Sequence, residues 1–313
     1  TDTMSYKLDK LTVFYCLDFQ RNGMPVDLSR LASKHRELEA DLAATPMPIN
    51  ANSWQQVRSW LGVDSSDAQY LSMLATKEGN ERAGRVLKVR KLKKLLSFIT
   101  KYDKPRVYGK FKPSARSGRL TSDDDNLQQI PRKLKCIFGF DKETPRTLIY
   151  SDYAQLELRT ICAILNVSVM ADMFRQGVDL HTYVASILFG DVITKEDRQV
   201  TKTYNFNLLY GGSVDMVISI LMTYGLWVDP VKANKHKAKW LNLFKEINKW
   251  QQECVVKWRK GKLNSTPLGR SYKSRLMTDF MNIQNQGAGS EVTKLALHYF
   301  SPWLTEYNKT LAE

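Results

Sequence analysis

One aspartate in this sequence stands where a metal-binding carboxylate is often found. Asp152 follows the run Arg146–Ser151, whose apolar centre predicts a buried strand, and it precedes apolar residues at helical spacing. A carboxylate at the end of a strand can hold Mg²⁺, which takes one or two carboxylates together with substrate phosphates. Aspartate is also favoured at the start of a helix, where it accepts hydrogen bonds from free backbone N–H groups. From position alone, Asp152 is therefore either a metal ligand or a helix cap.

Four side chains at four-residue spacing predict a ligand-binding face on a later helix. Arg198, Lys202, Phe206 and Tyr210 follow one another with a turn of about 40° around the helix axis at each step. Two cations and two aromatic rings on one face suit a triphosphate at one end and a stacked base at the other. A helix that faces a membrane or an acidic partner has a similar composition. His181 adds an imidazole to the first turn of another predicted helix, where anions bind, although a single histidine is more often structural.

Two long helices are predicted in the framework that must position these residues. Arg82–Thr100 is amphipathic, with an apolar side made of Leu87, Leu92, Leu95, Leu96 and Ile99. The remaining positions are largely basic: Arg85, Lys88, Arg90, Lys91, Lys93 and Lys94. That face is either a solvated surface or a track for a phosphate backbone. A second helix, over Ala233–Trp258, carries an apolar stripe that core packing explains better than a membrane or a partner helix: Trp240, Phe244, Ile247 and Trp250.

Shorter elements complete the framework. Leu11–Asp27 predicts a helix, a turn at Asn22-Gly23 and a short strand. Helices are also predicted over residues 28–42, 53–61, 181–189 and 198–210, and a turn over residues 266–270. The run Asp123-Asp124-Asp125 predicts a solvated loop rather than a metal site.

The composition favours a polyanionic partner. The chain has 313 residues, long enough for two or three subdomains, and 47 Lys and Arg against 32 Asp and Glu give a net charge of +15. This excess attracts nucleic acid first and a membrane surface second. No apolar run reaches the roughly 18 residues of a transmembrane helix, and no secretory signal opens the chain. The four cysteines form no CxxC pair, which predicts reduced thiols in a cytosol-like compartment and no zinc site.

Five segments, in order along the chain, resemble the motifs of the family A (DNA polymerase I-like) DNA polymerases. Ser151–Arg159 resembles motif A, DYSQIELR, and Arg198–Gly211 resembles motif B, RxxxKxxNFGxxYG. Ser117–Pro131 resembles the segment TGRLSSxxPNLQNIP, Asp179–Thr182 the DIHT stretch, and Asn282–Gly287 the helix that reads NAPxQG. The resemblance covers nearly the whole chain, and motifs of this specificity do not recur in this order by chance.

The resemblance implies an α+β right-hand polymerase fold of palm, thumb and fingers. Residues 1–28 are expected to enter the palm and 29–105 to form the thumb. Residues 106–170 would be the palm with motif A, 171–265 the fingers with motif B, and 266–313 the return to the palm. Motif C, a His-Asp-Glu turn on a strand hairpin, is not found, so an incomplete antiparallel palm sheet and a truncated or split polymerase are expected. The family's 3′–5′ exonuclease domain is not found either.

The resemblance also assigns roles to individual residues. Asp152 and the backbone carbonyl of Tyr153 are expected to hold Mg²⁺ in a two-ion site whose second carboxylate is not in this chain. Lys202 is expected to act in catalysis by protonating the leaving pyrophosphate. The expected nucleotide-binding residues are Arg198, Lys202, Phe206, Tyr210, His181, Glu157 and Gln155. The expected contacts with duplex DNA are Arg119, Asn126, Gln128, Asn282 and Gln286.

Three positions depart from the family pattern. Thr278 stands where the family often has arginine, so no DNA contact is expected there. Asn207 replaces the glycine that follows the phenylalanine of motif B, which is expected to alter packing beside the nucleotide. Ala154 replaces the serine of motif A, with little expected effect.

The implied function is DNA-templated addition of deoxynucleotides to a primer 3′-OH, with this chain alone weak or inactive. The implied partners are primer–template DNA, a dNTP, a C-terminal segment carrying motif C and a separate exonuclease domain, with no membrane. The expected location is the cytoplasm of a bacterium or of a phage-infected host. A non-catalytic DNA-binding fragment and a single-subunit RNA polymerase are the alternatives. Glu157 and Phe206 favour deoxynucleotides over the RNA polymerase.

Overall fold

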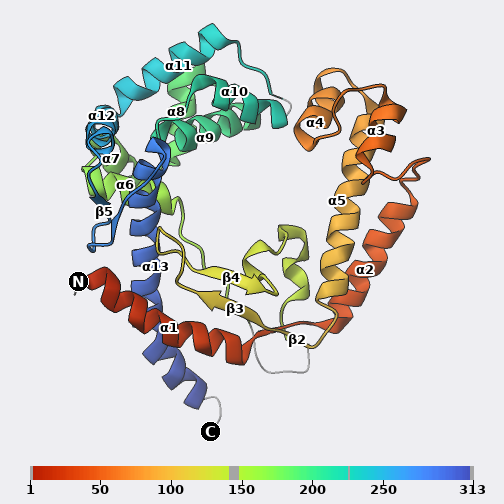
Figure 1. Cartoon of the computed structure of the whole chain (residues 1–313), viewed down its shortest axis with the longest axis horizontal. Coiled ribbons are helices and arrows are strands. Elements are labelled where there is room, and N and C mark those ends of the chain that lie inside the picture. Colours follow the sequence, from red (N-terminus) through yellow and green to blue (C-terminus); the bar gives the residue numbers. More distant parts are fainter. Residues whose placement is uncertain (1–2, 141–147, 225, 311–313) are drawn as a thin grey trace.

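The chain folds into a ring of helices around a central opening (Figure 1). A computed structural model describes residues 3–140, 148–224 and 226–310. Three units make up the ring, and we call them the arm, the helical cluster and the base. Within the described residues, no helix is both long and apolar enough to cross a membrane.

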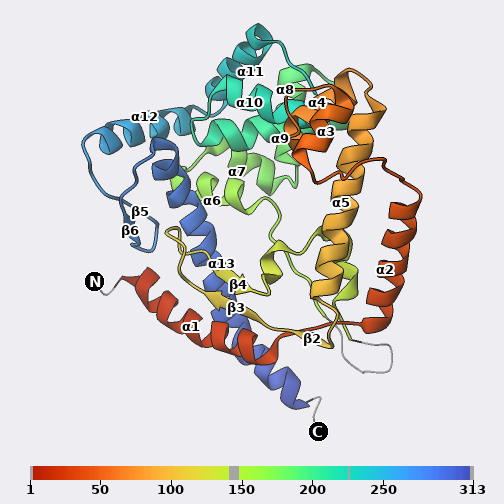
Figure 2. The same ribbon diagram turned by 45° about the vertical axis from the view of Figure 1, so that its right-hand side comes forward.

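The arm is built from the four helices of residues 28–101. They are α2 (Leu28–Ala43), α3 (Trp54–Leu61), α4 (Ala68–Lys77) and α5 (Glu81–Lys101). Helices α2 and α5 form the shaft, while α3 and α4 sit at its far end (Figures 1 and 2). A separate apolar core at that end, centred on Val57, Leu71 and Val86, makes the tip of the arm a packed unit.

The helical cluster forms the opposite side of the ring from residues 156–259. Its helices are α6 (Leu156–Leu165), α7 (Ser168–Arg175), α8 (Leu180–Phe189), α9 (Lys195–Leu209), α10 (Val214–Thr223), α11 (Pro230–Leu243) and α12 (Lys245–Arg259). They enclose the largest apolar core of the molecule, which includes Trp240, Tyr204 and Phe280.

The base joins the two sides and holds the strands. It contains α1 (Met4–Asn22), the short 3₁₀ helices η1 (Leu127–Gln129) and η2 (Arg132–Ile137), and the long helix α13 (Met277–Thr310). Its strands form antiparallel pairs: β1 (Met24–Pro25) with β2 (Arg106–Val107), and β3 (Gly109–Lys112) with β4 (Thr121–Asp124). A third pair, β5 (Asn264–Ser265) with β6 (Ser271–Tyr272), precedes α13. The described strands are therefore three small sheets, not one palm sheet.

Side-chain caps explain where several predicted helices begin. Asp27, Ser53 and Asn80 accept backbone N–H groups at the starts of α2, α3 and α5. Thr194 and Asp197 form a reciprocal capping box at the start of α9. The helices predicted over residues 28–42, 53–61, 82–100, 181–189 and 198–210 are confirmed to within a few residues, and the first helix starts earlier than predicted, at Met4.

Two of the predicted elements are wrong. Arg146 and Thr147 lie outside the described residues, and residues 148–151 form no strand, because no described strand pairs with them. Ile149 and Tyr150 are 78% and 62% exposed, so this run is not the buried strand that its apolar character predicts. The single helix predicted over residues 233–258 is two helices, which meet at Phe244.

Packing explains the break at Phe244. Its backbone leaves the helical region (φ −113°, ψ 65°), and its ring is fully buried edge-on to Trp240, with the ring centroids 4.9 Å apart. The bend lets α11 pack on α8 and α10 while α12 packs on α6 and α13. The apolar stripe is buried as expected, although against two different sets of neighbours.

The acidic run at residues 123–125 lies in and after strand β4 rather than in a loop. Lys110 and Lys112, on the neighbouring strand β3, pair with Asp124 and Asp123, while Asp125 pairs with Lys104. Each of these three carboxylates therefore has a lysine as its countercharge.

A partly buried ion cluster fastens the two ends of the base together. Asp9 on α1 accepts a hydrogen bond from Lys294 on α13 (2.6 Å) and pairs with Arg270 from the turn before β6. The Lys294 side chain is only 3% exposed. The Asp9 carboxylate offsets the cost of burying the Lys294 ammonium away from water. Gly118 adopts a positive φ against this cluster, where a Cβ would lie 2.7 Å from Nε of Arg270.

We expect Asp9→Asn to lower the free energy of unfolding by about 3 kcal/mol, because it leaves a buried ammonium without its countercharge. Urea unfolding of the whole chain measures the change. Asp18→Asn, at an exposed position on the same helix, is the control and should change the free energy by less than about 0.5 kcal/mol. Equal losses from the two variants would show that Asp9 is not the countercharge.

Two histidines are buried in the helical cluster in their neutral form. Burial lowers the pKa of His181 and of His236 to about 4. His236 packs its ring edge-on to Phe189 and Tyr204, and its Nδ1 atom is buried without a partner. The unfolded chain protonates these rings near their ordinary pKa of 6.5, so it binds more protons than the folded chain between pH 6.5 and about 4.

We therefore expect the free energy of unfolding to fall as the pH drops from about 6.5 toward 4. Denaturant titrations across this window test the expectation. His236→Phe keeps a ring in the same packing and removes the titrating group, so the pH dependence should become shallower. An unchanged slope in that variant would mean that His236 does not contribute to it.

Candidate functional site

The carboxylate of Asp179 joins the two segments that carry the predicted chemistry. It caps α8 by accepting the backbone N–H and the hydroxyl of Thr182, both at 2.9 Å. It accepts two hydrogen bonds from the Arg198 guanidinium, at 3.2 and 3.0 Å, and one from Nε2 of Gln155 at 3.2 Å. The Asp179 side chain thus holds Gln155, three residues after Asp152, against Arg198 in the first turn of α9.

The charge state of Asp179 is fixed by these contacts. Burial alone would raise the pKa of this carboxyl, but the hydrogen bonds from Arg198 and Thr182 outweigh burial and hold the pKa below its usual value. An ionised carboxylate with a two-pronged guanidinium partner is a strong and directional contact. The orientation of Arg198 is therefore set before any ligand binds.

This contact limits how far Asp152 can lie from α9. Asp152 precedes Gln155 by three residues, so their Cα atoms are at most about 11 Å apart. Lys202 follows Arg198 by one turn of α9, about 6 Å along the helix axis. Asp152 is exposed, and no hydrogen bond or ion pair joins it to Lys202 or to another predicted site residue in the described structure.

The predicted face of α9 contains a hollow of about 340 Å³ between α9 and α10. Lys202 and Phe206 line it together with Gln199, Thr203, Asn207, Ile220 and Tyr224. Lys202 is exposed and forms no ion pair among the described residues. The spacing of cation and aromatic ring therefore produces a shared concave surface with a charge available to a ligand.

His181 is placed beside this face but is buried. Its ring is 4% exposed and lies 5.7 Å from the ring of Phe206, measured between centroids. Its Nδ1 atom is 2.9 Å from Nδ2 of Asn205, and Oδ1 of Asn205 accepts the indole N–H of Trp240 at 2.7 Å. Asn205 was not among the predicted residues, although it lies within motif B, because its side chain points to the core side of α9.

A second network fixes Glu157 and Tyr210. Oε2 of Glu157 accepts the Tyr210 hydroxyl at 3.0 Å, and Oε1 pairs with Arg119 at 2.5 Å. Burial, reinforced by the Glu157 charge, raises the pKa of Tyr210 far above its usual value, so the phenol is a neutral donor. Tyr210 therefore faces a carboxylate and does not line the hollow with Lys202 and Phe206.

Asn285 completes this network from α13. Its Nδ2 donates to the backbone carbonyl of Glu157 at 2.8 Å and to the Tyr210 hydroxyl at 2.9 Å, and its Oδ1 accepts from Thr160 at 2.5 Å. Asn285 is fully buried and was missed, while its neighbours Asn282 and Gln286 were predicted. Only the tertiary structure shows that Asn285 links α13 to α6.

The remaining predicted DNA contacts lie in the base. Oδ1 of Asn126 caps η1 by accepting the backbone N–H of Gln128 at 3.0 Å, and the Gln128 amide donates to the carbonyl of Leu120 at 3.0 Å. Asn282 and Gln286 are half-buried on α13, and Oδ1 of Asn282 is buried without a partner.

The departure from the motif at Asn207 has a visible structural counterpart. A Cβ atom at Gly212 would lie 1.9 Å from Oδ1 of Asn207, so residue 212 must be glycine while Asn207 holds this rotamer. That Oδ1 atom is buried without a hydrogen-bond partner. Asn207 also lines the hollow beside Phe206.

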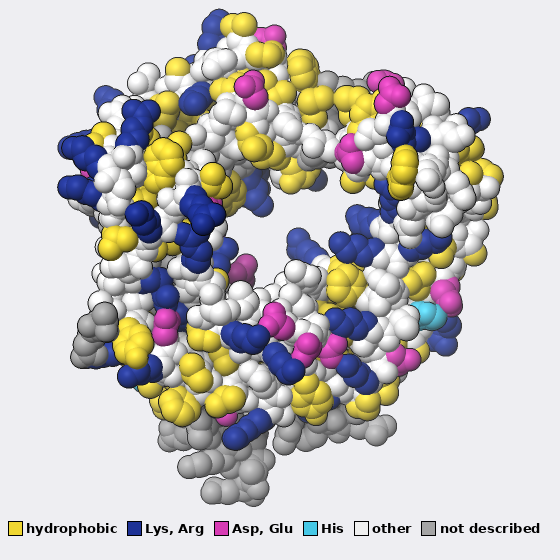
Figure 3. Space-filling view, viewed as in Figure 1, with side chains coloured by type: hydrophobic (Ala, Val, Ile, Leu, Met, Phe, Trp, Pro, Cys, Tyr) yellow, Lys and Arg dark blue, Asp and Glu magenta, His cyan; other side chains and the backbone are white. Residues whose placement is uncertain are grey.

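Basic side chains line the inner edge of the ring over α5 (Figure 3). Arg82, Arg85, Lys88, Lys91 and Lys94 are exposed at every third position of the helix. Arg90 is an exception to the predicted basic face, because it turns inward and donates to the carbonyls of Ala51 and Ser66, each at 2.6 Å. Of the other predicted basic residues, Arg85, Lys88, Lys91 and Lys94 are exposed and Lys93 is half-buried.

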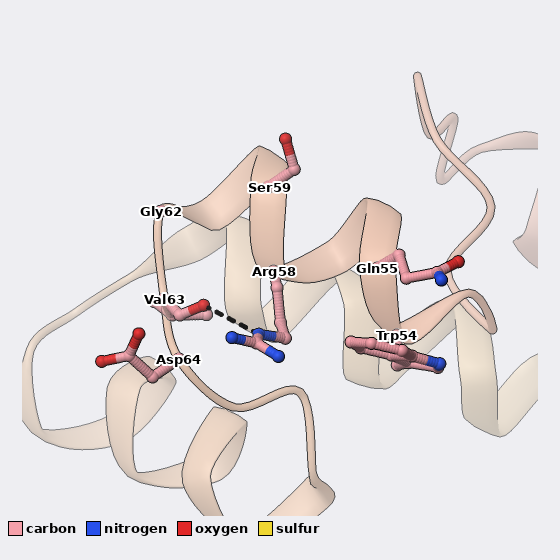
Figure 4. Close-up of a pocket in the computed structure, with 7 residues that line it drawn as sticks. All are labelled: Trp54, Gln55, Arg58, Ser59, Gly62, Val63 and Asp64. Atoms are coloured by element: carbon pink, nitrogen blue, oxygen red, sulfur yellow. Dashed lines mark hydrogen bonds between the residues drawn. The ribbon is translucent and has the colours of Figure 1, made fainter.

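A separate hollow of about 430 Å³ lies at the tip of the arm, outside the candidate site. Arg58 lies 5.5 Å from the centroid of the Trp54 ring and donates to the carbonyl of Val63 (Figure 4). None of the predicted site residues lines this hollow.

The described residues fit only part of a magnesium site. Asp152 and the adjacent carbonyl of Tyr153 have the oxygen chemistry that Mg²⁺ prefers. Among residues 3–140, 148–224 and 226–310, however, no group of three or more Asp, Glu, His or Cys side chains could hold a metal ion. The donor set present does not fit a two-ion site by itself.

Comparisons with known proteins agree with the motifs. The family model described as "DNA polymerase family A" matches residues 30–312. DNA polymerase I of Aquifex aeolicus is 30% identical over 89% of this chain and 53% of its own length, and a DNA polymerase of Bacillus phage SP01 is 26% identical over 61% and 24%. The chain thus spans about half the length of the first of these relatives, and less of the second.

A solved structure supports the same fold. It is described as the POL domain of Pol1 from M. smegmatis in complex with DNA primer-template and dNTP, and it superposes with a TM-score of 0.79 over 94% of this chain and 59% of its own. Its sequence is 21% identical, so this likeness concerns the fold. With the family match over residues 30–312, the conclusion is that this chain belongs to DNA polymerase family A.

Proposed function

We propose that this chain is the polymerase module of a DNA-templated DNA polymerase, which adds deoxynucleotides to a primer 3′-OH. The observation that carries the proposal is the Asp179 contact, which holds residues 152–155 beside Arg198 on α9. A carboxylate and two cations near one another suit the transfer of a nucleotidyl group from a triphosphate. Membership of the family and the primer-template and dNTP bound by the M. smegmatis domain support the same proposal.

In this proposal, Arg198 and Lys202 bind the triphosphate. Charge spreads over the phosphate oxygens during phosphoryl transfer, and cations held in place stabilise it. Arg198 is held by Asp179, whereas Lys202 has no partner among the described residues and can reach the phosphates and protonate the pyrophosphate. His181, which is neutral and anchored by Asn205, would offer its second ring nitrogen to a phosphate.

Glu157 and Phe206 would select the sugar. Phe206 lines the hollow on α9 and would pack on the deoxyribose. Glu157 is held by Arg119 and Tyr210, so its carboxylate is a fixed obstacle where a ribose 2′-OH would come. Gln155 would support the same site through Asp179.

The three units would correspond to the parts of a right hand. The arm would be the thumb (residues 29–105), the helical cluster the fingers (171–265), and the base with α6 the palm (1–28, 106–170 and 266–313). The basic side chains over α5 would grip the phosphate backbone. Arg119, Asn126, Gln128, Asn282 and Gln286 would contact the duplex near the primer end through the minor groove, whose acceptors are alike in all base pairs.

Asp152 would bind magnesium only together with ligands from other residues. When bound, the ions would supply charge stabilisation to the attacking and leaving oxygens. Asp152 and the Tyr153 carbonyl would hold part of the shell, and a second carboxylate would come from outside these 313 residues.

A non-catalytic primer–template-binding fragment is the second candidate. The observation in its favour is that no metal-binding group of side chains forms among the described residues. Primer extension distinguishes the two, because a fragment of this kind binds DNA but extends no primer even when a motif C segment is added.

Asp152→Asn should reduce primer extension by roughly a thousandfold, because the metal loses its carboxylate ligand, while DNA affinity stays unchanged. Extension is measured with Mg²⁺, dNTPs and an added polymerase segment that carries motif C. Asp191→Asn, an exposed carboxylate between α8 and α9, is the matched control. An unchanged rate in Asp152→Asn would remove Asp152 from the reaction.

Glu157→Ala should raise the ratio of ribonucleotide to deoxyribonucleotide incorporation by about tenfold or more, because a steric obstacle to the 2′-OH is lost. The ratio of kcat/KM values for matched rNTP and dNTP measures it. Tyr210→Phe keeps the carboxylate and removes only its phenolic partner, so its effect should be smaller. If the two variants relax the selection equally, Glu157 acts only by positioning Tyr210.

A further inference from the structure

The ring is closed by a contact between the tip of the arm and the helical cluster. Gln69, in the first turn of α4, donates from Nε2 to the backbone carbonyl of Ser219 at 3.1 Å and to its hydroxyl at 2.7 Å. Ser219 lies on α10, which sits next to α4 (Figure 1). Gln69 and Ser219 are 150 positions apart in the chain. Their helices meet on the side of the ring opposite the base.

With this contact, the ring surrounds a hollow that passes through the molecule. The space-filling view shows a hollow that passes through the centre, with Lys and Arg side chains at its inner edge (Figure 3). The arm, base and helical cluster are connected in that order by the chain itself. Without the Gln69–Ser219 contact the molecule would be an open cleft, and with it the hollow is enclosed on all sides.

Each partner in the contact belongs to its own packed unit. On α4, Leu71 and Leu74 are buried in the core of the arm tip. On α10, Val217 and Leu221 are buried in the core of the helical cluster. The α4–α10 contact is therefore a meeting of two separate units that can part without either core opening.

The chemistry of the contact suits reversible closure. Gln69 is exposed, both of its hydrogen bonds with Ser219 are between neutral groups, and such bonds are individually weak in water. Salt does not screen neutral hydrogen bonds, whereas it weakens the attraction of the basic inner edge for phosphates. Closure of the ring is thus independent of the forces that bind the DNA backbone.

We propose that the Gln69–Ser219 contact is a latch that closes this chain around its nucleic acid, so that the DNA is held by encirclement as well as by charge. The inference rests on the proposed function, since it takes primer–template DNA as the occupant of the hollow. It adds that DNA without ends enters only when the latch opens. It also means that a closed latch keeps such DNA from leaving.

The test is to fasten the latch covalently. Gln69→Cys and Ser219→Cys are combined in a Cys136→Ser background, because Cys136 is the exposed cysteine while Cys16, Cys162 and Cys254 are buried. A short bismaleimide then joins the two thiols without the strict geometry of a disulfide. The linked chain segment from residue 69 to residue 219 becomes a covalent loop around the hollow.

The DNA is a gapped circular plasmid, which offers a primer end but no end that can pass through a loop. Cross-linking after DNA is added should leave protein on the circle in SDS, and cutting the circle with a restriction enzyme should release it. Cross-linking before DNA is added should abolish capture on the circle. Gln69→Cys with Ser65→Cys, both within the arm, is the matched control and should trap no DNA.

Two outcomes would overturn the latch. One is efficient cross-linking in the presence of DNA with no SDS-resistant protein on the circle. The other is equal retention on circular and cut DNA. A gel shift of the same variants on linear primer–template, without cross-linker, separates this from the proposed function. Loss of that shift would contradict DNA binding itself, whereas a normal shift without trapping would contradict only the latch.

Discussion

The arrangement of the candidate site depends on one carboxylate that serves three segments. Asp179 caps α8, fixes the guanidinium of Arg198 on α9 and accepts the Gln155 amide from the segment after Asp152. Because an ionised carboxylate can accept several hydrogen bonds at once, it can align three backbone segments with little added side-chain freedom. Together with the hydrogen bond from Tyr210 to Glu157, these contacts hold the two motifs that carry the predicted chemistry against each other.

The candidate site contains side chains fixed by hydrogen bonds within the protein and exposed side chains that are free to bind a ligand. Glu157, Tyr210 and Asn285 bond to one another and to Thr160, so their positions are set by the fold. Asp152 and Lys202 are exposed and make no such contacts in the described structure. A site in which the surrounding groups are already fixed and the charges are exposed can bind an anionic ligand without rearranging its side chains.

Much of the framework follows from local signals in the sequence. Asp27, Ser53 and Asn80 mark helix starts because the first backbone N–H groups of a helix need acceptors, and these short side chains supply them. The family motifs identified the chain and placed Arg198, Lys202 and Phe206 on one helix. Local signals failed at Ile149, whose apolar neighbours predicted a strand, because a strand exists only where another strand pairs with it. They failed again at Phe244, where the choice of packing partners bends the chain.

The sequence by itself determined the family, the helices and the residue types of the site, since these depend on composition, spacing and contacts within a few residues. Only the tertiary structure decided that Asn205 and Asn285 anchor the site and that Arg90 leaves the basic face. It alone also showed that Gln69 meets Ser219 across the ring. Such contacts join positions far apart in the chain, and their partners are set by how whole helices pack rather than by any pattern along the sequence.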